Sequence, residues 1–176
     1  MASSTSTFTA GGGMITTDFG GVETGYSVAL QSDGKILVTG GTMDADGSVH
    51  SLLARYNVDG SLDSSFSGDG KVIIDSGPES LGVSVAVQND GKILVSGAID
   101  DGNAGGDFSL MRFNANGSLD TSFSGDGIAT TDFGGLDVGF SVATQSDGKI
   151  IVAGNHDGDF ALARYNANGS LDTSFS

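Results

Sequence analysis

The fold is decided by a stretch that reads Asp33-Gly34-Lys35-Ile36-Leu37-Val38, then Ala54-Arg55-Tyr56-Asn57, then Gly60-Ser61-Leu62-Asp63. The Asp-Gly-Lys-Ile motif recurs at Asp90 and Asp147, with a spacing of 57 residues each time. The Arg-containing motif recurs at Arg112 and Arg164, and the Gly-Ser-Leu-Asp motif recurs at Gly117 and Gly169. A fixed period of this kind indicates a repeat architecture, in which each supersecondary unit buries its faces against its neighbours.

Each repeat is expected to contain four short β-strands. The first repeat places them at 26–31, 35–39, 51–57 and 71–75. The equivalents lie at 85–88, 92–96, 108–114 and 128–132, and at 141–145, 149–153 and 160–166. The Asp-Gly after each first strand indicates a tight hairpin, for which we expect a type I′ turn with positive φ at both central residues. Four antiparallel strands per repeat are typical of a propeller blade.

The side chains of the third and first strands fit a blade that is covered on both sides. Leu52 and Leu53 point to opposite faces of the third strand, so both faces are apolar. Ser27 and Ala29 give the first strand small side chains, which suits the innermost position where blades converge. The rival architecture is a parallel β-helix, but its nonapeptide Gly-Gly-x-Gly-x-Asp pattern is absent.

The composition narrows the possible functions. The chain has 22 acidic and 7 basic residues, a formal net charge of −15, and no Cys. Strong negative charge argues against nucleic acid and anionic membrane surfaces as partners, and the lack of Cys excludes disulfides and thiol chemistry. No apolar run is long enough to insert into a membrane.

The repeated motifs resemble those of the delta-sixty repeat, a bacterial β-propeller family built from tandem units. The resemblance rests on the motifs at 33–38 and 54–57 and on Gly-Ser-Leu-Asp-Thr-Ser-Phe-Ser-Gly-Asp-Gly at 117–127. It covers nearly the whole chain after a Ser/Thr/Gly-rich leader. It implies a propeller in a large bacterial protein, extracellular or at the cell surface, and no settled biochemical activity. Delta-sixty arrays usually hold more than three units, and the chain departs from them there.

The expected domain organisation is a flexible leader at 1–13 and a three-repeat unit at 14–176, with repeats at about 25–75, 82–132 and 139–176. Residues 14–21 match 128–135, so 14–18 reads as a fourth strand without its own first three. The last repeat stops before its fourth strand. Propellers have about four to eight blades, and six is the multiple of three in that range. We therefore expect a homodimer whose two chains close a six-bladed ring, each lending 14–18 to the other. The alternative is that the chain is a fragment of a longer array of repeats.

Six of the seven cations recur at two repeat positions: Lys35, Lys92 and Lys149, and Arg55, Arg112 and Arg164. We expect each Arg to form an ion pair or to stack between blades, because a guanidinium pairs carboxylates and stacks on rings. The candidate partners are either Asp63, Asp120 and Asp172 or Asp18, Asp75 and Asp132. The functional alternative is a ring of cations for an anionic ligand.

The segment from Asn57 to Asp63 resembles a calcium loop, in which oxygen ligands alternate along the chain. Its copies replace Asp59 by Asn116 and Asn168, and no terminal Glu is present. The favoured interpretation is an Asx turn in which Gly supplies the positive φ.

The loops that differ among repeats are the best candidates for binding, because variable loops on a rigid scaffold usually carry function. They connect the second to the third strand and the fourth to the next first strand, and we expect both kinds on one face of the ring. The candidate ligand-binding residues are Asp44, Asp46, Asp100, Asp101, Asp107, His156, Asp157 and Asp159. Of these, Asp44, Asp46, Asp157 and Asp159 are the candidate ligands for calcium. A glycan held through a cation and a basic protein are the other expected partners.

Catalysis has little support in the sequence. His50 and His156 occupy no shared repeat position, no Gly-x-Ser-x-Gly elbow is present, and no paired Glu suggests glycoside hydrolysis. We therefore expect a non-catalytic structural or binding module. The alternative is a hydrolase that uses the Asp-rich loop face.

Overall fold

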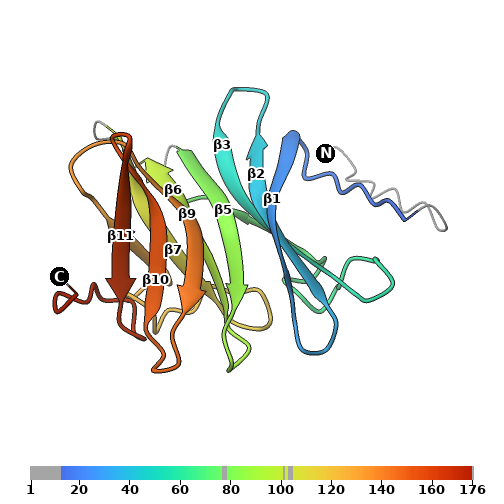
Figure 1. Cartoon of the computed structure of the whole chain (residues 1–176). Helices are drawn as coiled ribbons and strands as arrows, with labels where there is room; N and C mark the ends of the chain where they lie inside the picture. The colour runs from blue at the N-terminus through green and yellow to red at the C-terminus, as the bar shows by residue number, and fades with distance from the viewer. Residues whose placement is uncertain (1–12, 77–78, 101, 103–104, 176) are drawn as a thin grey trace.

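The computed structural model describes residues 13–76, 79–100, 102 and 105–175, and the leader at 1–12 lies outside the described part. The described residues form eleven strands and no helix (Figure 1). The strands are β1 (Val22–Leu30), β2 (Ile36–Met43), β3 (Val49–Tyr56), β4 (Lys71–Ile74), β5 (Glu79–Val87), β6 (Ile93–Asp100), β7 (Gly106–Phe113), β8 (Ile128–Thr131), β9 (Asp137–Thr144), β10 (Ile150–His156) and β11 (Asp159–Tyr165). Nothing in this described part is an apolar helix of membrane-spanning length.

The strands form three successive antiparallel units, which we call blades 1 to 3. Blade 1 has the order β1-β2-β3-β4, blade 2 the order β5-β6-β7-β8, and blade 3 the order β9-β10-β11. One parallel residue pair, Val49 with Glu79, links the first two blades. The described strands do not close into a ring, and β11 is a free edge. The all-β prediction and the four-stranded repeat are thus confirmed, and blade 3 lacks a fourth strand within the described residues.

The first strands are longer than expected from the sequence. Pairing of β1 with β2 continues past a bulge between Gly25 and Ser27 and reaches Val22, and β5 behaves in the same way between Gly82 and Ser84. A bulge admits one extra residue without ending the ladder. The strand interpretation stopped at Tyr26 because it did not anticipate the bulge.

The Asp-Gly hairpins form, but the expected turn type is wrong. Gly34 has φ +82°, whereas Asp33 is not among the residues with positive φ. The Gly34 N–H donates to the Gln31 carbonyl, and the Gln31 N–H donates to the Lys35 carbonyl. This is a three-residue loop with Gly in the left-handed position, which requires positive φ at one residue only. The Asp33 carboxylate accepts the Lys35 N–H at 3.1 Å and completes the turn.

The core lies between the blades. Two apolar clusters form, one between blades 1 and 2 that includes Leu37, Leu53 and Met111, and one between blades 2 and 3 that includes Phe108 and Val152. The first strands of neighbouring blades contact one another, β1 with β5 and β5 with β9. The small residues of these strands allow that approach, as expected for the innermost position.

Residues 14–18 do not form the fourth strand expected of them. Ile15 makes only an isolated bridge, and the residues around it are not in a strand. The segment lies on blade 1, where the Thr17 and Tyr56 hydroxyls are hydrogen-bonded at 2.7 Å. A strand needs a neighbouring edge to supply its ladder hydrogen bonds, and no unpaired third strand faces this segment within the described chain.

Candidate functional site

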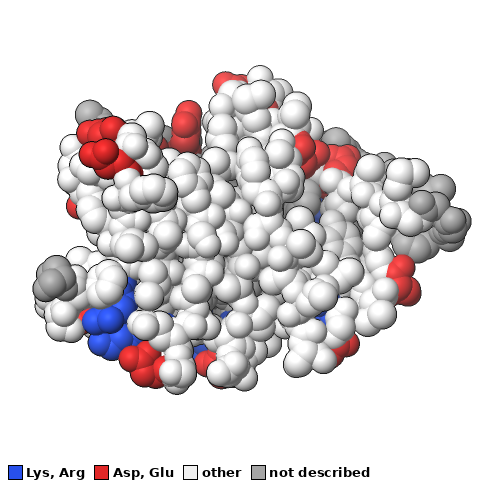
Figure 2. Space-filling view, in the orientation of Figure 1, with Lys and Arg blue, Asp and Glu red and all other residues white. Residues whose placement is uncertain are grey.

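The connections divide between two faces of the molecule (Figure 1). The β2–β3, β10–β11 and β8–β9 connections lie on one face, which we call the variable-loop face, together with the described residues of the β4–β5 and β6–β7 connections. The hairpins after β1, β5 and β9 and the turns after β3, β7 and β11 lie on the opposite face, the turn face. Figure 2 shows acidic side chains at both the upper, variable-loop edge and the lower edge, and its largest Lys/Arg patch lies at the lower edge.

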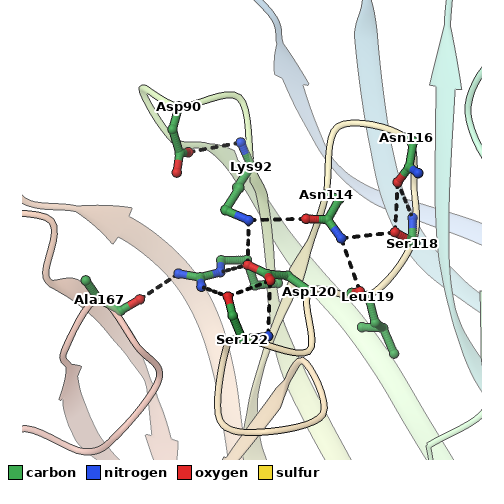
Figure 3. Close-up of polar contacts among 10 residues, drawn as sticks. Asp90, Lys92, Asn114, Asn116, Ser118, Leu119, Asp120, Ser122 and Ala167 are labelled. Atoms are coloured by element: carbon green, nitrogen blue, oxygen red, sulfur yellow. Dashed lines mark hydrogen bonds and ion pairs between the residues drawn. The ribbon is translucent and has the colours of Figure 1, made fainter.

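On the turn face, each repeated Arg is held by the Asp eight residues later. Arg112 donates from Nε to Asp120 Oδ2 at 2.7 Å, and Lys92 donates to the same oxygen at 2.7 Å (Figure 3). The Arg112 guanidinium lies over the Phe123 ring at 4.5 Å from its centroid. Its Nη1 donates to the Ala167 carbonyl of the next blade at 2.6 Å. The Arg therefore joins two blades as well as pairing with an acid.

The same arrangement recurs around the other repeated arginines. Arg55 pairs with Asp63 and donates from Nη1 to the Ala115 carbonyl of blade 2, and Arg164 pairs with Asp172. The rival set Asp18, Asp75 and Asp132 does not contact these arginines among the described residues; the Asp132 carboxylate instead accepts the Gly134 N–H. Each Arg and its Lys share one Asp, so every cation of the two repeated sets has a carboxylate partner within its own blade.

Pairing lowers the pKa of all three aspartates. Burial works to raise the pKa of Asp120, but the hydrogen bonds from Lys92 and Ser122 and the charge of Arg112 outweigh it and hold the pKa far below its usual range. The pKa of Asp63 is lowered in the same way: burial raises it, and the hydrogen bonds from Lys35 and Ser65 and the charge of Arg55 outweigh burial. The pKa of Asp172 is lowered mainly by the hydrogen bond from Lys149. These carboxylates are ionised at neutral pH.

The segment from Asn57 to Asp63 is a turn. The Asp59 carboxylate accepts both the N–H of Ser61 at 2.9 Å and its hydroxyl at 2.6 Å, and these bonds lower its pKa, the hydroxyl contributing most. Gly60 has φ +87°. The oxygens that an alternating calcium loop would direct at an ion are thus used to close an Asx turn.

On the variable-loop face, the candidate residues divide among loops of different blades. Asp44 lies 3.5 Å from His50, and Asp46 accepts the Ser48 N–H, which lowers its pKa. The Asp100 carboxylate accepts the Gly102 N–H at 2.7 Å. Asp101 lies outside the described residues.

The blade 3 candidates Asp157 and Asp159 have different surroundings. The Asp157 carboxylate accepts the N–H of Leu136, in the β8–β9 connection, at 3.1 Å, and Asp159 lies opposite His156 in the backbone ladder of the β10–β11 hairpin. The structure does not bring the four expected calcium ligands together: within the described residues, the one converging group of three acidic or His residues contains none of them.

That converging group is Asp107, Asp132 and Asp137, whose carboxylate oxygens lie within 4.8 Å of one another. Asp137 is fully buried, accepts the Phe133 N–H at 2.7 Å and lies 2.8 Å from Nδ1 of His156. Carboxylate oxygens are the ligands that Ca2+ prefers. Of the three, only Asp107 was predicted as a binding residue.

Asp137 lies in one of the variable loops that the sequence indicates as candidates, but it was not among the residues predicted to bind. The sequence contains an indication that Asp137 has a structural role, because aligning the repeats shows that Glu23 and Ser80 are its equivalents. Glu23 accepts the Phe19 N–H at 3.2 Å, as Asp137 accepts the Phe133 N–H. Glu23 and Asp137 therefore close the loops that enter β1 and β9 in the same way.

A hollow of about 410 Å³ also opens on the variable-loop face. Its apolar walls come from all three blades and include Val49, Leu81, Ala98 and Leu136. Glu79 and Asp100 add two acidic side chains to the lining. An apolar hollow with a few polar groups is the usual form of a ligand site, and its acidic character favours a basic or cationic partner.

Comparison with known families agrees with the repeat pattern. The family model described as "Domain of unknown function (DUF5122) beta-propeller" matches the chain in three segments, residues 31–66, 88–123 and 145–175. These segments begin at equivalent positions, just before each hairpin turn. No curated protein matches the chain.

Proposed function

This chain belongs to the beta-propeller family of unknown function DUF5122, and on that premise we propose that it is a non-catalytic propeller-repeat module that acts as a structural or ligand-binding scaffold. One observation carries this proposal. The charged residues that recur in every repeat are used within the blades, as in the pairing of Arg112 with Asp120. The loop residues that vary among the repeats lie on the opposite face and include Asp44, Asp100 and Asp157.

The chemistry of the variable-loop face indicates the class of partner. Its hollow is apolar with Glu79 and Asp100 among its lining residues, and the net charge of the chain is −15. Complementary charge raises encounter rates and suppresses wrong partners. These properties favour a basic protein segment, or a glycan held through a divalent cation.

Calcium is the cation that suits this face, because hard cations take several carboxylate oxygens. The converging oxygens of Asp107, Asp132 and Asp137 support this part of the proposal. Binding to the native state alone raises stability by mass action. Millimolar calcium should therefore raise the melting temperature more than sodium chloride of equal ionic strength does, and an equal effect of the two salts excludes a specific site.

The repeated sequence motifs support a more specific proposal, that the repeats are delta-sixty repeats of a bacterial surface or secreted protein. The assembly we propose is a six-bladed ring made of two copies of the three blades, and the match of residues 14–21 with residues 128–135 supports it. The alternative function, a hydrolase at the Asp-rich face, differs in a measurable way. In a hydrolase, Asp→Asn substitutions on this face abolish turnover, whereas in a binding module they weaken capture of the partner only.

Calorimetric titration with a lysine-rich peptide tests the binding proposal. The combined variant Asp44→Asn, Asp100→Asn and Asp159→Asn should bind the peptide more weakly than the wild type. The matched control removes three charges from the turn face, with Asp33→Asn, Asp90→Asn and Asp147→Asn, since Asn still completes those turns. Equal weakening by both variants would show a mere net-charge effect and contradict a site on the variable-loop face.

A further inference from the structure

A repeated set of contacts, which we call the joint, connects each blade to the next on the turn face. Between blades 1 and 2, Arg55 Nη1 donates to the Ala115 carbonyl, and the Ser67 N–H donates to the Asn116 carbonyl at 2.8 Å. Between blades 2 and 3, Arg112 reaches Ala167 in the same way, and the Ser124 N–H donates to the Asn168 carbonyl at 2.8 Å. The joint thus has two sides, an arginine side and a carbonyl side.

The joint also has an apolar part. On the arginine side of the second joint, Phe108, Leu110 and Phe123 are fully buried. On its carbonyl side, Val142, Val152, Ala161, Ala163 and Tyr165 belong to the same cluster. Burial of these apolar side chains between the blades stabilises the joint through the hydrophobic effect.

A third contact involves the fourth strand. At the end of β8, the Thr131 hydroxyl is bonded to the Tyr165 hydroxyl of blade 3 at 2.8 Å. The equivalent residues of the first joint are Ile74 and Phe113, which are apolar and pack in one cluster. Each joint therefore has a chemically matched pair at this position.

The outer side of blade 1 carries the same contact. Thr17 is bonded to Tyr56 at 2.7 Å, and these residues are equivalent to Thr131 and Tyr165 in the repeat alignment. The segment around Thr17 therefore lies where the fourth strand of a preceding blade would lie. Beneath it is a hollow of about 380 Å³ lined by Val38, Leu52 and Tyr56, among other residues.

The two end faces of the chain are the two unmatched sides of a joint. On blade 3, Phe160 is fully exposed and Leu162 is 54% exposed, although their equivalents Phe108 and Leu110 are buried completely. Arg164 pairs with Asp172 and lies over the Phe175 ring, but its Nη1 has no hydrogen-bond partner within the described residues.

On blade 1, the carbonyl side is equally uncovered. Val28 is 64% exposed, whereas its equivalent Val142 is 8% exposed. Val58 occupies the position of Ala115 and Ala167, whose carbonyls accept the arginines, and it is 73% exposed. An exposed apolar face of this kind marks an interaction site.

We propose that a second copy of this chain fills both end faces, with blade 3 of each copy docked on blade 1 of the other through the same joint that connects the blades within a chain. This inference rests on the proposed six-bladed propeller. Arg164 donates to the Val58 carbonyl of the second copy, and Leu162 and Phe160 enter the hollow beneath the Thr17 segment. Residues 14–18 pair with the free edge of β11 as β8 pairs with β7. Two such joints close the ring by a twofold axis and leave no free edge.

Light scattering coupled to size exclusion tests the joint. The wild type should have twice the 17.6 kDa mass of the chain, and Leu162→Asp should give a folded monomer, because it places an uncompensated charge in the joint. The matched control is Ile73→Asp, since Ile73 is 51% exposed and its equivalent Thr130 stays exposed beside a neighbouring blade. The control should remain a dimer.

Three outcomes overturn the proposal: a monomeric wild type, a trimer or open polymer, or a Leu162→Asp dimer. Circular dichroism of each variant establishes that it is folded. A monomeric wild type that still binds the lysine-rich peptide on its variable-loop face refutes the joint and leaves the scaffold function standing. A dimer that does not bind the peptide supports the joint and contradicts the proposed binding function.

Discussion

Arg112→Ala is the substitution that most directly perturbs the repeated contacts between the blades. It removes the bonds from Nε to Asp120 and from Nη1 to Ala167, together with the stacking on Phe123. The Arg112 and Asp120 side chains are only 8% and 7% exposed, so solvent does not replace these contacts fully. Removing one partner of a buried pair costs about 3–5 kcal/mol.

The lower end of that range applies, because Lys92 still donates to Asp120 in the variant. A loss of about 3 kcal/mol corresponds to a fall of about 6–12 °C in melting temperature for a chain of this size. Thermal and urea denaturation followed by circular dichroism measure it. Peptide binding on the opposite face should be unchanged.

Lys92→Ala is the matched control for this substitution. It removes the other cation from the same carboxylate, but the Lys92 side chain is 28% exposed and contacts no carbonyl of the next blade among the described residues. Its loss should be about 1 kcal/mol or less, as for solvent-accessible ion pairs. If Arg112→Ala leaves the melting temperature unchanged, or if Lys92→Ala is equally costly, the arginine does not join the blades.

Three further predictions follow from the same contacts. Folding lowers the pKa of Asp120 and its equivalents, so the stability that they contribute is present above the ordinary Asp pKa of about 3.9 and is lost as pH falls below it. Urea denaturation midpoints measured between pH 6 and pH 2 should show this loss, and Asp120→Asn should make the midpoint depend less on pH. Deleting residues 1–21 should abolish the dimer or cause aggregation, measured by light scattering, because the edge of β11 then stays unpaired. At the second joint, Tyr165→Phe alone should destabilise by about 1 kcal/mol, because Thr131 loses a hydrogen bond, and adding Thr131→Ile should restore stability toward that of the wild type, as the apolar pair of the first joint does.

Much of the fold could be predicted because the repeat exposes it three times. The spacing of Asp33, Asp90 and Asp147 sets the length of the blade, and the alternation at Leu52 and Leu53 shows that both of its faces are covered. The hairpin turn was misassigned because Asp-Gly fits a two-residue and a three-residue loop equally well. Only the hydrogen bond between Gln31 and Lys35 decides between them.

The candidate site was harder to predict, because its residues have no common period. Asp137 meets Asp107 and Asp132 only after the β8–β9 loop folds back toward the start of β7. Asp44 and Asp159 looked alike in the sequence, yet they lie on loops of different blades. Spacing along a strand determines which face a side chain occupies, whereas irregular loops determine which side chains converge.

A crystal structure of the chain tests the central claim most directly, because it shows the number of blades and what covers each end face. The account predicts two chains around one ring of six blades, with Arg164 Nη1 within hydrogen-bond distance of the Val58 carbonyl of the second copy and residues 14–18 paired with its β11. A compact monomer in which residues 14–18 pair with β11 of their own chain would contradict it.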